Sequence, residues 1–289
     1  MPALAPKAIP AFLEHVSRWL PSSAPPPAAA LVPLLAATAL GHSATWLKPC
    51  LAHALSPHPP LPPGAPAPPQ PPQGNPLLDA ATHPRRLVVA QLKEALTKSA
   101  SLIGVPRVIC ALLDLDDALD DPRDRATAFV RRGLEHGTVE QKRAAGRNGL
   151  ESVYKGELEG IFGMMRDRGL DDLRYLSETT TYGTFLTPFA SSHPTPPSAS
   201  RPPTPDPLAH DPRLLSLVTL PCLVAQRSHR ETAWHLRGAI RRGWDRDDVE
   251  KVQCAIEAVC EACGVEGVGE GMPRVADVEV QEEERLRGA

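Results

Sequence analysis

Aromatic residues are scarce in this chain of 289 residues, where Phe, Trp and Tyr together make up only 4 %. Ala, Leu and Val supply most of the hydrophobic residues, which account for 42 % of the chain. Strands are usually rich in aromatic and β-branched residues, so this bias favours packed helices over sheets. The apolar fraction is sufficient for the core of one large domain or of two small ones.

The chain also lacks an excess of positive charge, because 31 Lys and Arg residues stand against 34 Asp and Glu residues. The formal net charge of −3 excludes the broad basic field that nucleic-acid binding requires. No apolar run reaches the roughly 20 residues of a membrane span. The apolar run at 28–40 is interrupted by Pro33. We therefore expect neither a nucleic acid nor a membrane as a partner.

No long apolar stretch marks a secretory signal at the N-terminus. The six cysteines are therefore expected to be reduced, and the localisation intracellular and cytoplasmic. The first eighty residues contain only two acids, Glu14 and Asp79. Such an acid-poor start is also compatible with a mitochondrial transit peptide, although we favour an ordinary N-terminal helix.

Proline is abundant, with 34 residues, and its clustering suggests the domain organisation. Proline cannot donate a backbone hydrogen bond and prefers extended geometry, so residues 56–82 are predicted to be a linker. A ligand for a proline-binding partner is the alternative for this segment. The linker would join a helical extension at 1–55 to a helical domain at 83–268. We expect a loop insertion at 190–212 and a fraying acidic tail at 269–289.

Local signals predict where several helices begin and end. Thr138 and Gln141 form a capping-box pattern, and a glycine suits the position just after a helix. Inside helices, Gly146 and Gly149 are expected to weaken or interrupt one, and Pro221 to kink or break another. The apolar spacing predicts helices at 8–20, 28–55, from 83, at 150–168, 171–186, 213–227, 229–242 and from 245, with Gly169, Gly243 and Gly264 as the glycines that close three of them.

The stretch from Glu231 to Glu250 resembles the signature of the carboxymuconolactone decarboxylase-like and alkyl hydroperoxidase D-like superfamily. It contains His235, followed by Gly238 and Ala239, then Gly243, and then a capped acidic helix start. A weaker likeness to fungal-type members extends over residues 84–265, through Leu102–Leu113 and Tyr182-Gly183. The resemblance implies an all-α fold of two packed helical halves, often assembled as a homo-oligomer.

The chain departs from the peroxide-reducing branch of that superfamily. The Cys-x-x-Cys pair of that branch would fall at positions 228 and 231, where this chain has Ser228 and Glu231. Peroxidase activity is therefore disfavoured. The decarboxylase branch keeps an acid and a histidine near this position, which is closer to the residues found here.

Glu231 and His235 are four residues apart and so share one helix face. The resemblance places this face towards a pocket and implies that the two residues are the catalytic pair. A carboxylate beside an imidazole raises the pKa of the histidine, so His235 would transfer a proton and Glu231 would orient it. Arg237 and Arg241 lie on the same helix and are the predicted binding groups for an anionic substrate. The alternative is an exposed ion pair beside two solvated arginines.

Cys260 and Cys263 form the one Cys-x-x-Cys in the chain. They fall at the end of a predicted helix, where the helix dipole opposes a thiolate, so we expect them to be packing residues. The sequence has no phosphate-binding glycine loop, nucleophile elbow or zinc motif, and predicts neither a cofactor nor a metal.

Three functional hypotheses remain from the sequence. The first is an acid–base enzyme, a decarboxylase-like lyase, acting on a small carboxylate or lactone of unknown identity. The second is a non-catalytic oligomeric scaffold of the same fold. The third is a thiol redox protein that uses Cys260 and Cys263.

Overall fold

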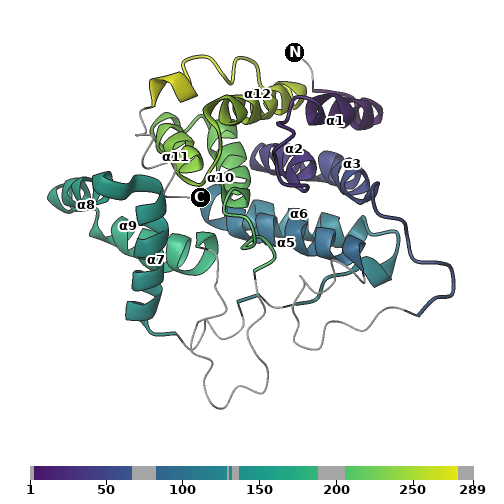
Figure 1. The fold of residues 1–289 in the computed structure, drawn as a ribbon, viewed down its shortest axis with the longest axis horizontal. Coiled ribbons are helices and arrows are strands. Elements are labelled where there is room, and N and C mark those ends of the chain that lie inside the picture. The colour runs from purple at the N-terminus through teal and green to yellow at the C-terminus, as the bar shows by residue number, and fades with distance from the viewer. Residues whose placement is uncertain (1–2, 67–82, 129, 132–136, 188–205, 279–289) are drawn as a thin grey trace.

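The computed structural model describes residues 3–66, 83–128, 130–131, 137–187 and 206–278 (Figure 1). These ranges form helices joined by turns and loops, with no strand among them, which confirms the predicted all-α class for this part of the chain. Within the same ranges, no helix is both long enough and apolar enough to cross a membrane.

Two helices that are apolar on all sides lie at the centre, α2 (Ala28–Ala39) and α10 (Leu214–Ala225). They pack against each other, and every residue of both is buried except Ala29. A helix without a polar face has to be covered on all sides. The covering helices are α3 (Ser43–Leu55), α5 (Pro84–Ile103), α6 (Val105–Asp117), α11 (His229–Arg241) and α12 (Arg246–Ala262).

The N-terminal helices belong to this same core. The 3-10 turn η1 (Pro6–Ala8) leads into α1 (Ile9–Ser17), which packs on α3. The predicted single helical stretch at 28–55 is divided into α2 and α3 at Gly41, whose φ is +84°. The predicted end of the N-terminal extension, residue 55, is the end of α3. One hydrophobic core includes side chains from both sides of this position.

A second group of helices lies at the left of Figure 1. It consists of α7 (Val139–Tyr154), the short turn η5 (Lys155–Glu157), α8 (Leu158–Asp167), α9 (Asp171–Leu176) and η6 (Ser177–Leu186). The segment predicted as one helix at 171–186 consists of the short α-helix α9 followed by η6, which is a π-helix. Such wide turns are rare and are frequently found at functional sites. The group joins the core because α7 packs on α11 and η6 packs on α5.

The expected interruption at Gly146 and Gly149 does not occur, because α7 runs unbroken through both. The two glycines lie where η6 crosses α7. A Cβ atom on Gly146 would lie 2.9 Å from the backbone nitrogen of Gly183, and one on Gly149 would lie 3.1 Å from the ring of Tyr182. Glycine at 146 is thus needed for the close approach of the two backbones, and glycine at 149 for the packing of the Tyr182 ring against α7.

Other boundary signals are confirmed. Thr138 and Gln141 form the predicted capping box, with hydrogen bonds of 3.2 and 2.9 Å. Three glycines that follow helices have positive φ angles of 69°, 94° and 89°, at Gly169, Gly243 and Gly264. Of the predicted kink or break at Pro221, the break does not occur, since α10 continues through this residue.

A buried ion network connects α5 to the end of η6. Lys98 Nζ lies 2.8 Å from Asp206 and 3.4 Å from Glu94, and it donates to the carbonyl of Phe185 at 2.8 Å. Glu94 also accepts two hydrogen bonds from Arg131, at 3.0 and 2.7 Å. Lys98, Glu94 and Asp206 are almost completely buried. Two cations therefore face two carboxylates.

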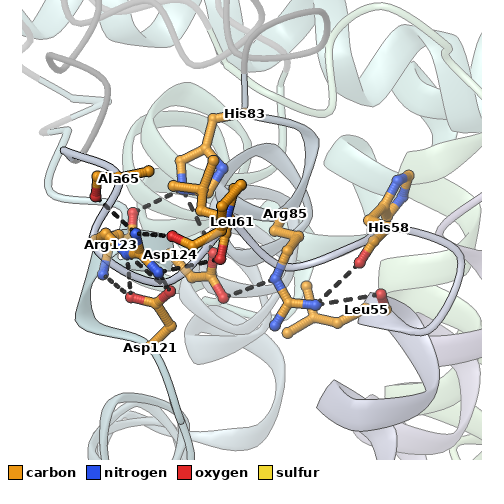
Figure 2. A network of polar contacts seen from close by, with 10 residues as sticks. Leu55, His58, Leu61, Ala65, His83, Arg85, Asp121, Arg123 and Asp124 are labelled. Atoms are coloured by element: carbon orange, nitrogen blue, oxygen red, sulfur yellow. Dashed lines mark hydrogen bonds and ion pairs between the residues drawn. The ribbon is translucent and has the colours of Figure 1, made fainter.

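Arginines hold the first part of the proline-rich segment on the core (Figure 2). Arg123, in the short turn η3 (Pro122–Asp124), donates to the carbonyls of Leu61, Pro62 and Ala65 at 3.3, 3.2 and 2.8 Å. Prolines offer carbonyls but no N–H groups, so side chains supply additional donors to this segment.

Two carboxylates fix the arginines that hold this segment. Arg123 is paired with Asp121 at 2.7 Å, and Arg85 with the buried Asp124 at 2.9 Å. Arg85 also donates to the carbonyl of His58 at 3.1 Å. The part of the predicted linker described here, 56–66, is therefore bound to the core. Residues 67–82, and most of the predicted insertion at 190–212, lie outside the described residues.

The first ten residues of the predicted C-terminal tail do not fray. Met272, Val275 and Val278 are buried, and Val275 begins the short turn η7 (Val275–Asp277). Arg274 is paired with Glu250 and Glu257 of α12. Residues 279–289 lie outside the described part.

Candidate functional site

His235 lies at the junction of the core and the second helix group. It is on the inner face of α11 and only 3 % exposed. Its Nε2 atom lies 3.3 Å from the hydroxyl of Tyr182 in η6, and its Nδ1 atom lies 3.1 Å from the hydroxyl of Thr219 in α10. Both ring nitrogens are thus occupied by hydroxyl groups from two other elements.

Glu231 lies one turn before His235 but has a different partner. It accepts a hydrogen bond of 3.3 Å from the hydroxyl of Tyr154, at the end of α7. The ring of Tyr154 packs edge-on against Trp234, with centroids 5.3 Å apart, and against His235 at 6.5 Å. Glu231 is half-buried, so it lies at the solvent end of the cluster.

The pKa of His235 moves in the direction opposite to the predicted one. Burial lowers the pKa of His235 from 6.5 to about 3, and the positive charge of Arg242 lowers it further. The imidazole is therefore neutral near pH 7. No hydrogen bond joins it to Glu231, whose oxygen is bound to Tyr154 instead.

Burial acts in the opposite direction on the acids of the cluster. It raises the pKa of Glu231, against the effects of the Tyr154 hydrogen bond and of Arg230. It also raises the pKa of Tyr182 to about 12 and that of Tyr154 well above 10. Glu231 is thus the side chain in the cluster whose pKa moves from the acid range towards neutrality.

The polar side chains form a row from the surface to the core, made of two hydrogen-bonded groups: Glu231 with Tyr154, and Tyr182 with His235 and Thr219. Tyr154 and Tyr182 lie close enough to act on each other's pKa: Tyr182 raises that of Tyr154, and Tyr154 lowers that of Tyr182 against the larger effect of burial. The order is therefore Glu231, Tyr154, Tyr182, His235 and Thr219. Such a row can hold or pass a proton, and it fixes the orientation of each member.

The two predicted substrate-binding arginines are bound to protein groups. Arg237 is paired with Glu157 of η5, and Arg241 donates to the backbone carbonyl of Val153. The arginine whose charge acts on His235 and Tyr182 is Arg242, which the sequence prediction passed over. It is only 6 % exposed.

Sequence spacing contained a signal for Arg242. Glu231, His235, Gly238 and Arg242 follow one another at intervals of four, three and four residues, which is one face of a helix. Tyr154, Tyr182 and Thr219 lie 16 to 77 positions away from their partners along the chain. For them the sequence offered only the weak likeness at Tyr182.

Cys260 and Cys263 do not have the properties of a redox pair. Both are free and buried, and burial raises the pKa of each to about 12. A thiolate is the reactive form of cysteine, and at neutral pH it is almost absent at such pKa values. Within the described ranges, no three side chains of His, Cys, Asp or Glu come together as a metal site.

Two surface hollows lie away from the cluster. One has a volume of about 320 Å³ and is bordered by Lys48, His58 and Arg85. The other, of about 420 Å³, is bordered by Trp19 and Cys254. Neither is lined by His235, Glu231 or Arg242, so we base the candidate site on the buried polar cluster.

No model of a known protein family matches the chain, and no match was found among curated proteins or solved structures. The polar cluster around His235 is therefore the evidence on function that the molecule offers.

The burial of His235 is expected to make the fold sensitive to acid. Between pH 6.5 and about 3, the unfolded chain binds a proton that the folded chain does not. Above pH 6.5 His235 is neutral in both the folded and the unfolded chain, so its burial then has no cost from protonation. Below pH 6.5 the free energy of unfolding should fall by up to about 1.4 kcal/mol per pH unit.

Urea unfolding at pH 7, 6, 5 and 4 measures this dependence. His235→Gln should reduce the slope below pH 6.5, whereas His210→Gln, at an exposed position, should leave it unchanged. Equal slopes for His235→Gln and the wild type would show that His235 is not held neutral by burial.

Proposed function

We propose that this protein is an acid–base enzyme of the carboxymuconolactone decarboxylase-like type, acting on a small carboxylate or lactone. The observation that supports this most directly is the row of polar side chains that runs from the half-buried Glu231, bonded to Tyr154, to the buried His235, bonded to Tyr182 and Thr219. Enzymes commonly raise the pKa of a carboxyl group by burial so that it exchanges protons near neutral pH.

The roles differ from those that the sequence suggested. Glu231 has the raised pKa and the access to solvent, so we assign it the proton transfer. His235 is neutral and is bonded at both nitrogens, so we assign it a positioning role through Tyr182. Tyr154 holds the carboxyl group of Glu231 in place.

The assignment can be tested without knowing the product. Small keto acids, hydroxy acids and lactones are incubated with the protein in D₂O, and NMR follows deuterium uptake, ring opening and loss of the carboxyl group. Glu231→Gln should slow the reaction by about 10²- to 10⁴-fold, as expected for a lost general acid or base.

Glu151→Gln is the matched control, because Glu151 is exposed on α7, one turn before Tyr154. It should react at the wild-type rate. A Glu231→Gln protein that keeps the wild-type rate would remove Glu231 from the mechanism. The pKa of Glu231 is raised above 4.5. If the reaction needs the carboxylate form, the rate should therefore fall as the pH is lowered, and this fall should begin at a higher pH than for an ordinary glutamate.

One observation favours the alternative of a non-catalytic oligomeric scaffold. The outer face of α6 exposes Val105, Ile109 and Leu113 at 56, 51 and 62 %. They are spaced four residues apart and form an apolar stripe that a second chain could cover. A chain that self-associates through this stripe, and turns over none of the compounds above, would support the scaffold.

A further inference from the structure

Arg242 follows the last residue of α11, and its side chain lies back along that helix. The position of its guanidinium depends on Gly238, one turn earlier. A Cβ atom on Gly238 would lie 3.3 Å from Arg242 Nη1 and 3.1 Å from Val153 Cγ1. Glycine at this position therefore leaves the space that the guanidinium occupies.

The guanidinium is buried with few partners. Its Nη2 atom donates to the hydroxyl of Ser152 at 3.4 Å, and its Nη1 atom has no hydrogen-bond partner. None of the ion pairs found among the described residues includes Arg242. A buried charge without a counter-ion costs several kcal/mol, so buried arginines are normally paired.

Other buried cations of this protein follow that rule. Lys98 has Asp206 and Glu94, and Arg241 has the carbonyl of Val153. Arg242 lies within electrostatic range of Tyr154 and Tyr182, whose raised pKa values keep them neutral, and of the neutral imidazole of His235. The guanidinium of Arg242 therefore has no carboxylate bound to it among the described residues, and its Nη1 atom has no hydrogen-bond partner.

We propose that Arg242 is the binding site for the carboxylate group of a small anionic ligand. The carboxylate would accept a hydrogen bond from Nη1, beside the hydroxyls of Tyr154 and Tyr182, with the remainder of the ligand directed to the half-buried Glu231. Arginine suits this role because its planar fork matches a carboxylate. The proposal rests on the proposed function, to whose carboxylate substrate it assigns a binding residue. Binding at Arg242 can be measured whether or not the ligand reacts.

The test measures binding through thermal unfolding at constant ionic strength. Acetate and benzoate should raise the melting temperature of the wild-type protein, whereas acetamide and benzamide, which have the same shape without the charge, should not. Arg242→Met should abolish the carboxylate effect, with a loss of affinity of about tenfold or more. Without ligand, Arg242→Met should melt at or above the wild-type temperature, because an unpaired buried charge has been removed.

Two neighbouring arginines provide controls. Arg237→Met, which loses an ion pair to Glu157, should keep the carboxylate response. Arg241→Met should lower the melting temperature, because Arg241 donates to the Val153 carbonyl inside the protein. Arg242→Lys is the second variant at the site; it keeps the charge without the fork and should show a weakened response.

The outcomes separate this proposal from the proposed function. Absence of a carboxylate-specific shift in the wild type, or its persistence in Arg242→Met, overturns the site. A shift that depends on Arg242, without turnover of any compound, keeps the site and removes the enzyme. Turnover that is unchanged in Arg242→Met keeps the enzyme and removes the site.

Discussion

Gly146→Ala is expected to destabilise the protein by about 3 kcal/mol or more, at the upper end of the range for overpacking. The added methyl group would overlap the backbone carbonyl of Glu178 and lie 2.9 Å from the nitrogen of Gly183. Both neighbours are backbone atoms of η6, which cannot turn away as a side chain can. Urea unfolding measures the loss. Since η6 carries Tyr182, the hydrogen bond to His235 should be disturbed as well.

Gly160→Ala is the matched control for this substitution. Gly160 also lies inside a helix, α8, but nothing lies within 4 Å of the position of its Cβ atom. Alanine there should stabilise the protein by about 0.4–1 kcal/mol, because glycine costs more backbone entropy. A Gly146→Ala protein as stable as the wild type would contradict the close packing of α7 against η6.

Lys98→Met should be the other severe substitution, with a loss of about 3–5 kcal/mol. Lys98 Nζ lies 2.8 Å from the fully buried Asp206. Methionine fills a similar volume but leaves the carboxylate without its cation, and breaking one side of a buried pair is costly. The carbonyl of Phe185, at the end of η6, also loses its donor.

Two further variants show whether the loss comes from charge. Lys93→Met, on the same helix, removes only a 3.1 Å hydrogen bond to the carbonyl of Ala126, and should cost about 1 kcal/mol. Lys98→Met combined with Asp206→Asn should recover part of the loss, because the unpaired charge is gone. A single Lys98→Met variant within 1 kcal/mol of the wild type would contradict the role of the ion network.

The sequence predicted helix ends well and helix surroundings poorly. A capping box at Thr138 and a glycine such as Gly169 act through their nearest neighbours along the chain, so their effects can be read locally. Gly146 shows the limit of local signals. Its low helix propensity suggested an interruption, whereas tertiary contact with η6 decides its role. The wide turns of η6 had no local signal that we recognised.

The same distinction applies to the candidate site. Glu231 and His235 were predicted on one helix face, and α11 places them one turn apart. The sign of the His235 pKa shift was missed because burial and the charge of Arg242 depend on elements far away in the chain. A spacing rule places side chains on a face, but it does not tell which of their partners arrive from other helices.

The way in which Arg85 and Arg123 hold the proline-rich segment bears on how this part of the chain can evolve (Figure 2). Both arginines bind main-chain carbonyls, which every amino acid possesses. Substitutions among residues 58–65 therefore leave the acceptors in place, provided that the path of the backbone is kept. Selection on this stretch should act on Arg85, Arg123 and their two carboxylate partners more strongly than on the residues they hold.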